Sequence, residues 1–253
     1  SSRKIKFYYP IPIMCGRYSV YDHLEKLESH FEARWELSEL RPRYNAAPSQ
    51  YLPVVYQQES SRLIRPFRWG LISSTAIEKP DFAPINARAE TVDQKWPFKI
   101  AFSRRRRCLI PASGFFEWKG SKGNKKPYHS VPENAPFFAF AGLYDIWQQG
   151  AGDAATFSYT IITTAASDKM EPLHHRMPAI LQPEEFDIWL DTNHSDAHAL
   201  KDMLDPFPGD GFDYYPVSKK VNSYKNEDPS LVEPADEEPG SGNDDTSQPS
   251  LFD

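Results

Sequence analysis

The sequence predicts a single compact α+β domain, built mainly of antiparallel β-sheet with a few short helices. Three observations predict this class. Short runs rich in β-branched and aromatic residues recur along the chain and are separated by Pro, Gly and Asn. Stretches with helical periodicity are fewer, and they do not alternate with the strand-like runs as a doubly wound fold requires. The chain of 253 residues, 40% hydrophobic and 25% charged, is also long enough to bury one sizeable core.

Six strands and three helices follow from local patterns. The strands are expected where short runs are rich in β-branched or aromatic residues, at residues 51–56, 64–71, 107–110, 115–118, 137–144 and 159–164. A helix is expected over residues 22–31, where Leu24, Leu27 and Phe31 recur at spacings of three and four. A second is expected at 183–190, which opens with Pro and two acids, and a third at 198–204.

Charge and composition exclude several classes of protein. Residues 228–253 hold eight acidic side chains and no base, so this segment carries −8 and the remaining chain +2. The segment is also rich in Pro, Ser and Gly, which predicts a disordered tail from residue 228. Two cysteines are too few for a disulfide framework, which favours a reducing, cytoplasmic setting. No apolar run has the roughly 18 residues that a membrane span needs, and we expect no membrane partner.

The motifs that carry chemistry are rare ones. The sequence lacks the phosphate-binding, dinucleotide-binding, zinc-protease and serine-hydrolase signatures GxxxxGK, GxGxxG, HExxH and GxSxG. Four other segments combine potential nucleophiles, acids, imidazoles and guanidinium groups: MCGRYSV at 14–20, INARAET at 85–91, RRCLIPASGFFEW at 106–118 and LHHRMPAIL at 173–181.

These four segments, in this order, resemble the SOS-response-associated peptidase (SRAP) family, whose members process abasic sites in single-stranded DNA. RYNAAPSQ at 43–50, RWGLI at 68–72 and VSKKVNSYKNE at 217–227 extend the resemblance to most of the chain. It implies the SRAP fold over residues 14–227, preceded by a leader at 1–13 and followed by the tail. It also implies covalent capture of the abasic aldehyde by the Cys that follows the initiator Met, here Cys15, without a metal or organic cofactor.

The chemistry of the residue types agrees with that role. An N-terminal Cys15 would combine an α-amine of pKa about 7.7–8.0 with a thiol of pKa about 8.5, both nucleophilic near neutral pH. The amine can form a Schiff base with the aldehyde, and the thiol can close a thiazolidine on the same carbon. By resemblance Glu117 and His174 open the sugar and move protons, while the Asn86 amide holds the amine or a sugar hydroxyl.

Each catalytic candidate has a structural alternative. Without its context, Cys15 would be a small buried hydrophobe, and Glu117 a surface acid alternating with core rings. Cys108 lies inside an apolar strand and is expected to be a core thiol. His174 and His175 are adjacent, and the family pattern H-x-R-M-P places the catalytic imidazole at His174.

The DNA-binding candidates are four. Arg17 and Arg88 are predicted to clamp phosphates, because planar guanidinium groups suit bidentate phosphate contacts. Arg106 belongs to a run of four arginines that is either a DNA contact or a solvated strand entry. Trp69 is either a stacking face for a base or a core residue. The expected partner is single-stranded DNA containing abasic sites, bound by a monomer.

Both ends of the chain raise separate hypotheses. Fourteen residues precede Cys15, and an internal Cys has no free amine. Either translation starts at Met14 and Met removal exposes Cys15, which we favour, or the domain cleaves the Met14–Cys15 bond itself. At the other end, Gln248, Leu251 and Phe252 resemble the Q-x-x-L-F peptides that dock on replication sliding clamps, although a plain disordered end would also contain such residues.

Two other functions remain open at this level. A non-covalent single-stranded DNA-binding module would keep all its DNA interactions after Cys15→Ala. A thiol peptidase acting in trans would use Cys15 and His174 as a dyad, turn over peptides and ignore DNA. A lyase that nicks DNA from the Schiff base is a variant of the main hypothesis.

Overall fold

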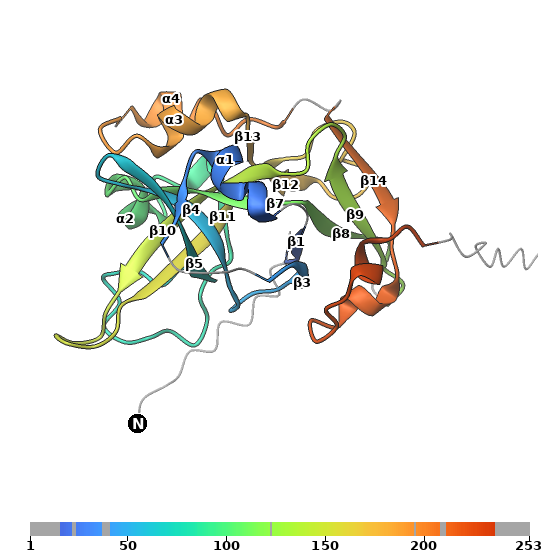
Figure 1. The fold of residues 1–253 in the computed structure, drawn as a ribbon, viewed down its shortest axis with the longest axis horizontal. Coiled ribbons are helices and arrows are strands. Elements are labelled where there is room, and N and C mark those ends of the chain that lie inside the picture. Colours follow the sequence, from blue (N-terminus) through green and yellow to red (C-terminus); the bar gives the residue numbers. More distant parts are fainter. Residues whose placement is uncertain are drawn as a thin grey trace, which may run out of the picture.

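Two β-sheets form the framework of the computed structural model (Figure 1), which describes residues 16–21, 24–36, 41–121, 123–194, 196–207 and 211–235. The smaller sheet has the strand order β14-β9-β8-β1-β3. Its strands are β1 (Tyr18–Val20), β3 (Arg43–Ala46), β8 (Gly114–Lys119), β9 (Lys126–Pro132) and β14 (Phe212–Pro216). All its pairings are antiparallel. This sheet contains β1, which follows the predicted nucleophile in the chain, and β8, which contains the predicted acid Glu117.

The larger sheet follows the order β12-β11-β10-β7-β4-β5-β2, with β13 beside β10 and β6 beside β11. Its strands are β2 (Arg34–Trp35), β4 (Tyr51–Gln58), β5 (Ser61–Trp69), β6 (Asn86–Arg88), β7 (Arg107–Ala112), β10 (Phe138–Trp147), β11 (Thr156–Ala165), β12 (Arg176–Pro178) and β13 (Ile180–Leu181). Because β11 also pairs with β5, in parallel, strands β5, β4, β7, β10 and β11 close into a ring.

The helices are short and cover one side of the larger sheet. They are α1 (Leu27–Phe31), α2 (Phe98–Ser103), α3 (Phe186–Leu190) and α4 (Ala197–Asp202), and α3 and α4 lie along the top edge in Figure 1. In the described part of the chain, 3-10 turns accompany them: η1 (Leu24–Lys26), η2 (Ala89–Thr91), η3 (Pro183–Glu185), η5 (Lys219–Asn222) and η6 (Pro229–Val232).

Strand alternation sorts the apolar side chains into two cores. On β10, Phe138 and Phe140 face a cluster that joins the two sheets, whereas Ala139 and Leu143 face the helices. Cys108 lies fully buried in the first cluster, as expected of a core thiol, and burial raises its pKa. Each fully buried aromatic or aliphatic side chain contributes about 1.5–3 kcal/mol, so the two-sided burial of these strands fixes their register.

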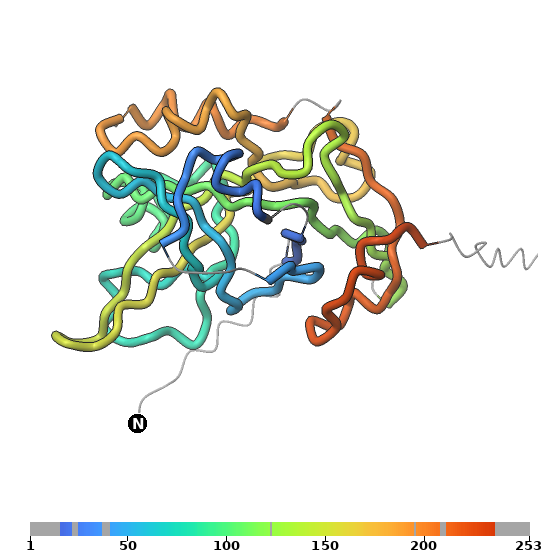
Figure 2. Tube along the Cα trace, viewed as in Figure 1, coloured from blue at the N-terminus to red at the C-terminus, as the bar shows by residue number. Residues whose placement is uncertain are grey.

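A third core lies behind the smaller sheet and involves the C-terminal segment. Phe116 packs there against Val221, Leu231 and Val232, and the red C-terminal trace in Figure 2 passes beside the blue β1 and β3. The prediction that the ordered domain ends at residue 227 is therefore wrong. Leu231 and Val232 of η6 are buried against Phe116. These two apolar side chains anchor a segment whose acidic, Pro-rich composition alone predicts disorder.

The predicted fold class is confirmed, since the described chain is one domain of mainly antiparallel sheet with short helices. All six predicted strands exist, and β4, β5, β7, β8, β10 and β11 each extend or shift by a few residues. The predicted helices correspond to η1 with α1, to η3 with α3, and to α4. The other described strands escaped prediction. Most of them have only two to four residues, and the longer β9 and β14, KPYHSVP and FDYYP, contain Pro and polar residues that weaken the strand pattern.

Candidate functional site

The pairing of β1 with β8 places the start of the described chain beside Glu117. Tyr18 pairs with Phe115, and the backbone N–H of Phe116 donates to the carbonyl of Arg17 at 3.0 Å. Continuing this antiparallel register by one residue sets Gly16, which is buried, alongside Glu117. Cys15 itself lies outside the described residues. Gly16, the residue that follows Cys15, therefore lies beside Glu117, the predicted acid.

Glu117 faces the interior between the two sheets. It is only 4% exposed. Side chains alternate along a strand, so Glu117 points to the same face as Phe115, which belongs to the core between the sheets. Phe116 and Trp118 point to the opposite face and pack on the third core. The alternative of a surface acid is therefore excluded by the burial of this carboxyl group.

Asn86 and Arg88 are the first and last residues of β6. This strand runs parallel to β11, with Asn86 beside Ile161 and Arg88 beside Thr163. The Asn86 side chain is half-buried, whereas the Arg88 side chain is 64% exposed and lies 3.9 Å from the carboxylate of Glu90. The Asn86 amide oxygen is itself buried, and the exposed Arg88 cation lies two residues further along the strand.

His174 lies in the loop between β11 and β12 and is half-buried. Its Nδ1 lies 3.1 Å from the backbone nitrogen of Arg176 and 3.3 Å from the Arg176 carbonyl oxygen, so the Arg176 backbone fixes the orientation of the ring. Its ring stacks on His175, with 4.3 Å between centroids. Burial lowers the pKa of His174, and the nearby His175 and Lys125 lower it further, against smaller opposing effects of the Arg176 backbone and Glu171.

An ion pair ties the segments of Asn86 and His174 together. Arg176 is 5% exposed and pairs with the carboxylate of Glu90, with one N···O contact of 3.0 Å. The same guanidinium donates to the Thr163 carbonyl at 2.6 Å on β11. Arg176 holds the pKa of Glu90 below its usual range. Residues 85–91 and 173–181, which are far apart in sequence, are therefore joined directly by this ion pair.

The three predicted catalytic segments border the same core. Phe115 beside Glu117, Ile161 beside Asn86, and Leu173 and Met177 around His174 all belong to the cluster between the two sheets, as does Tyr18 of β1. Lys125, in the β8–β9 turn, also lies near enough to His174 to affect its pKa. The fold thus gathers these segments around one region at the junction of the sheets.

Trp69 does not offer a stacking face. Its ring is fully buried, stacks on Tyr159 and packs edge-on against Tyr18, and its indole N–H donates to the Ile85 carbonyl at 3.1 Å. Trp69 is therefore a core residue, as the alternative interpretation predicted. Because Ile85 immediately precedes Asn86, Trp69 fixes the start of the strand that carries the predicted amide.

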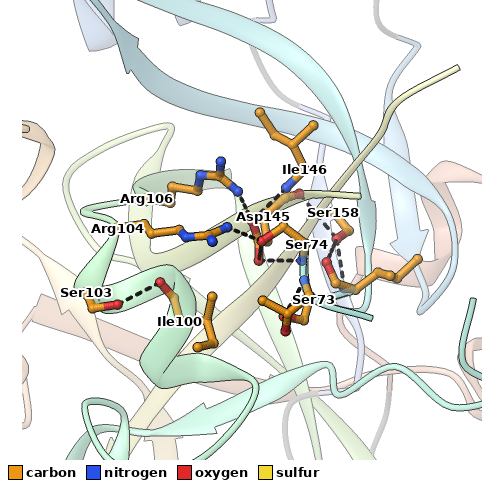
Figure 3. Close-up of polar contacts among 11 residues, drawn as sticks. Ser73, Ser74, Ile100, Ser103, Arg104, Arg106, Asp145, Ile146 and Ser158 are labelled. Atoms are coloured by element: carbon orange, nitrogen blue, oxygen red, sulfur yellow. Dashed lines mark hydrogen bonds and ion pairs between the residues drawn. The ribbon is translucent and has the colours of Figure 1, made fainter. Parts of the chain in front are cut away.

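Arg106 is likewise held inside the molecule (Figure 3). It forms an ion pair with Asp145, a fully buried carboxylate that also accepts from the backbone N–H of Ser74 at 2.7 Å and from its hydroxyl at 2.9 Å. Arg104 binds the same Ser74 hydroxyl. This geometry favours a structural role for Arg106 over the predicted DNA contact, because releasing it would leave a buried charge unpaired.

A polar platform behind β1 was missed by sequence reasoning. Asn45 donates to the carbonyls of Val221, Ser223 and Asn226 at 2.9–3.2 Å, and its Oδ1 accepts from Arg17 at 2.8 Å. Glu227 accepts from the backbone N–H of Asn45 at 3.1 Å. The signal lay in the sequence as RYN at 43–45 and NE at 226–227, but only the fold shows that they meet. Arg17, predicted to bind DNA, is half-buried in this platform.

Within the described ranges, no group of three His, Cys, Asp or Glu side chains is arranged to hold a metal ion. Among the helices described there, none is long and apolar enough to cross a membrane.

The fold and these segments define a protein of the SOS response associated peptidase (SRAP) class: the model of that family matches residues 14–224, and the chain belongs to the family. The abasic site processing protein YoqW of Bacillus subtilis is 38% identical over 224 residues, covering 87% of this chain and 99% of the relative. The abasic site processing protein HMCES of Pongo abelii is 31% identical, covering 88% and 77%.

A solved structure supports the fold. An X-ray structure of a protein from Bacteroides thetaiotaomicron superposes with a TM-score of 0.78 at 28% identity, and covers 87% of this chain and 100% of its own.

Proposed function

We propose that this protein binds single-stranded DNA and captures abasic sites as a covalent thiazolidine through Cys15, once the residues before it are absent. Its membership of the SRAP family, and relatives named abasic site processing proteins, support a role in abasic-site handling. The observation that carries the finer proposal is the β1–β8 register, which sets Gly16 beside the buried Glu117.

The proposed reaction is a balanced condensation. The Cys15 α-amine adds to C1′ of the ring-opened deoxyribose, and the carbinolamine loses water to form a Schiff base. The thiolate then adds to the same carbon and the amine nitrogen gains a proton, which closes the thiazolidine. One C–N and one C–S bond form, and one water leaves.

We propose roles for the other groups that their positions in the fold support. In the tautomer whose Nδ1 accepts from the Arg176 backbone N–H, the neutral His174 ring would donate from Nε2–H to the sugar oxygen as the sugar ring opens. The lowered pKa of His174 keeps the imidazole uncharged at neutral pH. Glu117 would exchange protons with the amine and the departing hydroxyl, and Asn86 would hold a hydroxyl or the amine by hydrogen bonds without changing charge.

The DNA strand would be held mainly by the exposed Arg88. Its guanidinium is free to approach a phosphate, with one weak ion pair to Glu90 at 3.9 Å. Arg17 would attract the DNA through its positive charge but make fewer direct contacts with phosphates than Arg88, because its guanidinium already forms three hydrogen bonds within the protein.

Two further activities belong to the same centre. If the thiol fails to close the ring, the Schiff base permits elimination of the 3′ phosphate and a strand nick, which gives lyase activity. Cleavage of the Met14–Cys15 bond by Cys15 with Glu117 and His174 would give the peptidase activity in the family name. Initiation at Met14 followed by Met removal would produce the same N-terminal Cys.

The test is a denaturing gel. The chain starting at Cys15 and the chain as printed are each incubated with a single-stranded oligonucleotide that carries one abasic site. We expect a heat-stable shifted band for the chain starting at Cys15. A shift for both chains would indicate self-cleavage, which intact mass would detect. No shift despite DNA binding would overturn the proposal in favour of a non-covalent binding module.

Two controls separate the alternatives. Cys15→Ala should retain DNA binding and lose the heat-stable band, whereas a non-covalent module would be unaffected. Turnover of a peptide substrate with indifference to DNA would support the thiol peptidase acting in trans.

The tail carries a separate proposal, because Gln248, Leu251 and Phe252 lie outside the described residues. If they dock on a sliding clamp, deletion of residues 248–253 should abolish clamp capture and leave crosslinking to free DNA intact.

A further inference from the structure

Asn222, the last residue of η5, contacts two strands at once. Its backbone carbonyl accepts a hydrogen bond from the Arg17 guanidinium at 3.1 Å, and its side-chain Oδ1 accepts from the indole N–H of Trp118 at 2.7 Å. Arg17 flanks β1 and Trp118 lies in β8. One residue of the C-terminal segment therefore bridges the neighbouring strands of the smaller sheet.

The two bridged side chains flank the proposed reacting groups. Arg17 is the second residue after Cys15, and Trp118 directly follows Glu117. Both point to the face opposite the Glu117 carboxyl, since Trp118 packs on the third core while Glu117 faces the first. Asn222 thus holds the strand ends from behind, at the point where Gly16 runs beside Glu117.

The turn that carries Asn222 is itself fixed. The Asn45 side chain binds the carbonyls of Val221 and Ser223, on either side of Asn222. Val221 is fully buried in the third core. Asn222 is therefore presented from a rigid frame, so that its side-chain bond can restrain Trp118.

We infer that Asn222 is a positioning residue for covalent capture: it locks the ends of β1 and β8 in register, so that the chain next to Cys15 meets Glu117 in a reactive geometry. This inference rests on the proposed function. Trp118 and Asn222 also line a surface hollow with Gly123 and Lys125, so the bond shapes one wall of that hollow.

The kinetic test compares three variants of the chain that starts at Cys15. Asn222→Ala removes the acceptor, Asn222→Asp keeps an oxygen at the same place, and Asn226→Ala loosens the same turn by deleting the bond from Asn226 Nδ2 to the Lys220 carbonyl. We expect Asn222→Ala to lower the first-order crosslinking rate constant at saturating DNA by about threefold to tenfold, the range for one hydrogen bond. Asn222→Asp should stay within about twofold of wild type.

The rate constant should change in Asn222→Ala, but the affinity for DNA should not. The DNA concentration at half-maximal rate should change by less than about twofold in Asn222→Ala, because the bond lies behind the reacting groups. If Asn226→Ala slows crosslinking as much as Asn222→Ala does, or if Asn222→Asp is as slow as Asn222→Ala, then Asn222 only stabilises the turn. Either result would overturn the inference.

A double-mutant cycle tests the partner. Trp118→Phe keeps an aromatic ring and removes the N–H donor. If the Asn222–Trp118 bond carries the effect, Asn222→Ala should slow the reaction in wild type and leave the rate of Trp118→Phe unchanged. Additive losses would contradict the inference.

An NMR measurement separates this inference from the proposed function. The Trp118 indole N–H signal, assigned by its loss in Trp118→Phe, should exchange with solvent faster in Asn222→Ala and at the wild-type rate in Asn226→Ala. If wild type forms no crosslink yet the signal behaves this way, the proposed reaction fails while the positioning contact stands. An unchanged signal in Asn222→Ala would refute the contact itself.

Discussion

His129 is a buried imidazole whose neutral form the fold requires. It is fully buried on β9, its Nε2 lies 2.9 Å from the Ser19 hydroxyl, and its Nδ1 lies 3.1 Å from the Tyr215 hydroxyl. The Tyr215 hydroxyl also donates to the Val232 carbonyl at 2.8 Å, and the Ser19 hydroxyl to the Gly114 carbonyl at 3.2 Å. Burial lowers the pKa of His129 to about 3.

This shift makes stability depend on pH. The unfolded chain protonates His129 near pH 6.5, whereas the folded protein does not until about pH 3, so the unfolded state binds more protons between these values. Stability from this residue is fully present above pH 6.5 and is lost as the pH falls. From pH 7 to pH 5 the loss is about 2 kcal/mol.

The perturbation is His129→Asn, which keeps a donor for Tyr215 and removes the titration. The assay is urea unfolding of both proteins at pH 7 and pH 5. Wild type should lose about 2 kcal/mol more than the variant over this interval, because the depressed pKa values of His30 and His174 act equally on both. Equal losses in the two proteins would refute the argument that His129 is held neutral by the fold.

The remaining predictions concern three charged side chains. Arg106→Ala should lower the free energy of unfolding by about 2–3 kcal/mol, because it leaves the buried Asp145 carboxylate without its cation. Arg88→Ala should weaken binding of single-stranded DNA and leave the melting temperature unchanged. Thermal melting and fluorescence anisotropy of both variants test this, and the reverse pattern would contradict the assigned roles. Glu90→Gln should destabilise by about 1–2 kcal/mol, discounted because Glu90 is half-exposed. Since Arg176 lowers the pKa of Glu90, this cost should shrink as the pH falls through that depressed value, and a cost independent of pH would count against the ion pair.

The six predicted strands are present because both faces of most of them are buried, which gives them a strong apolar and aromatic pattern. Apart from Gly142, the run of residues 137–144 is apolar or aromatic at every position, and its aromatic content predicts a strand even without alternation. The pairing of β11 with β5 and the resulting ring were beyond reach, because no local pattern shows which strands meet.

The candidate site divides in the same way. The motifs identified Asn86, Glu117 and His174 as candidates, but which other candidates are buried could be seen only in the fold. The Trp69 ring is buried in the core, and Arg106 forms an ion pair with Asp145, which lies 39 positions away in the chain. A run of four arginines resembles a solvated surface in sequence, because the partners of buried cations are distant in the chain.

The most direct test of the central claim is intact mass spectrometry of the chain starting at Cys15 after incubation with an abasic single-stranded oligonucleotide, without reductant and after heating. The account predicts one adduct with the combined mass of protein and oligonucleotide minus one water, mapped to Cys15 by proteolysis. An adduct that appears only after borohydride reduction, or that maps to a lysine, would contradict thiazolidine capture.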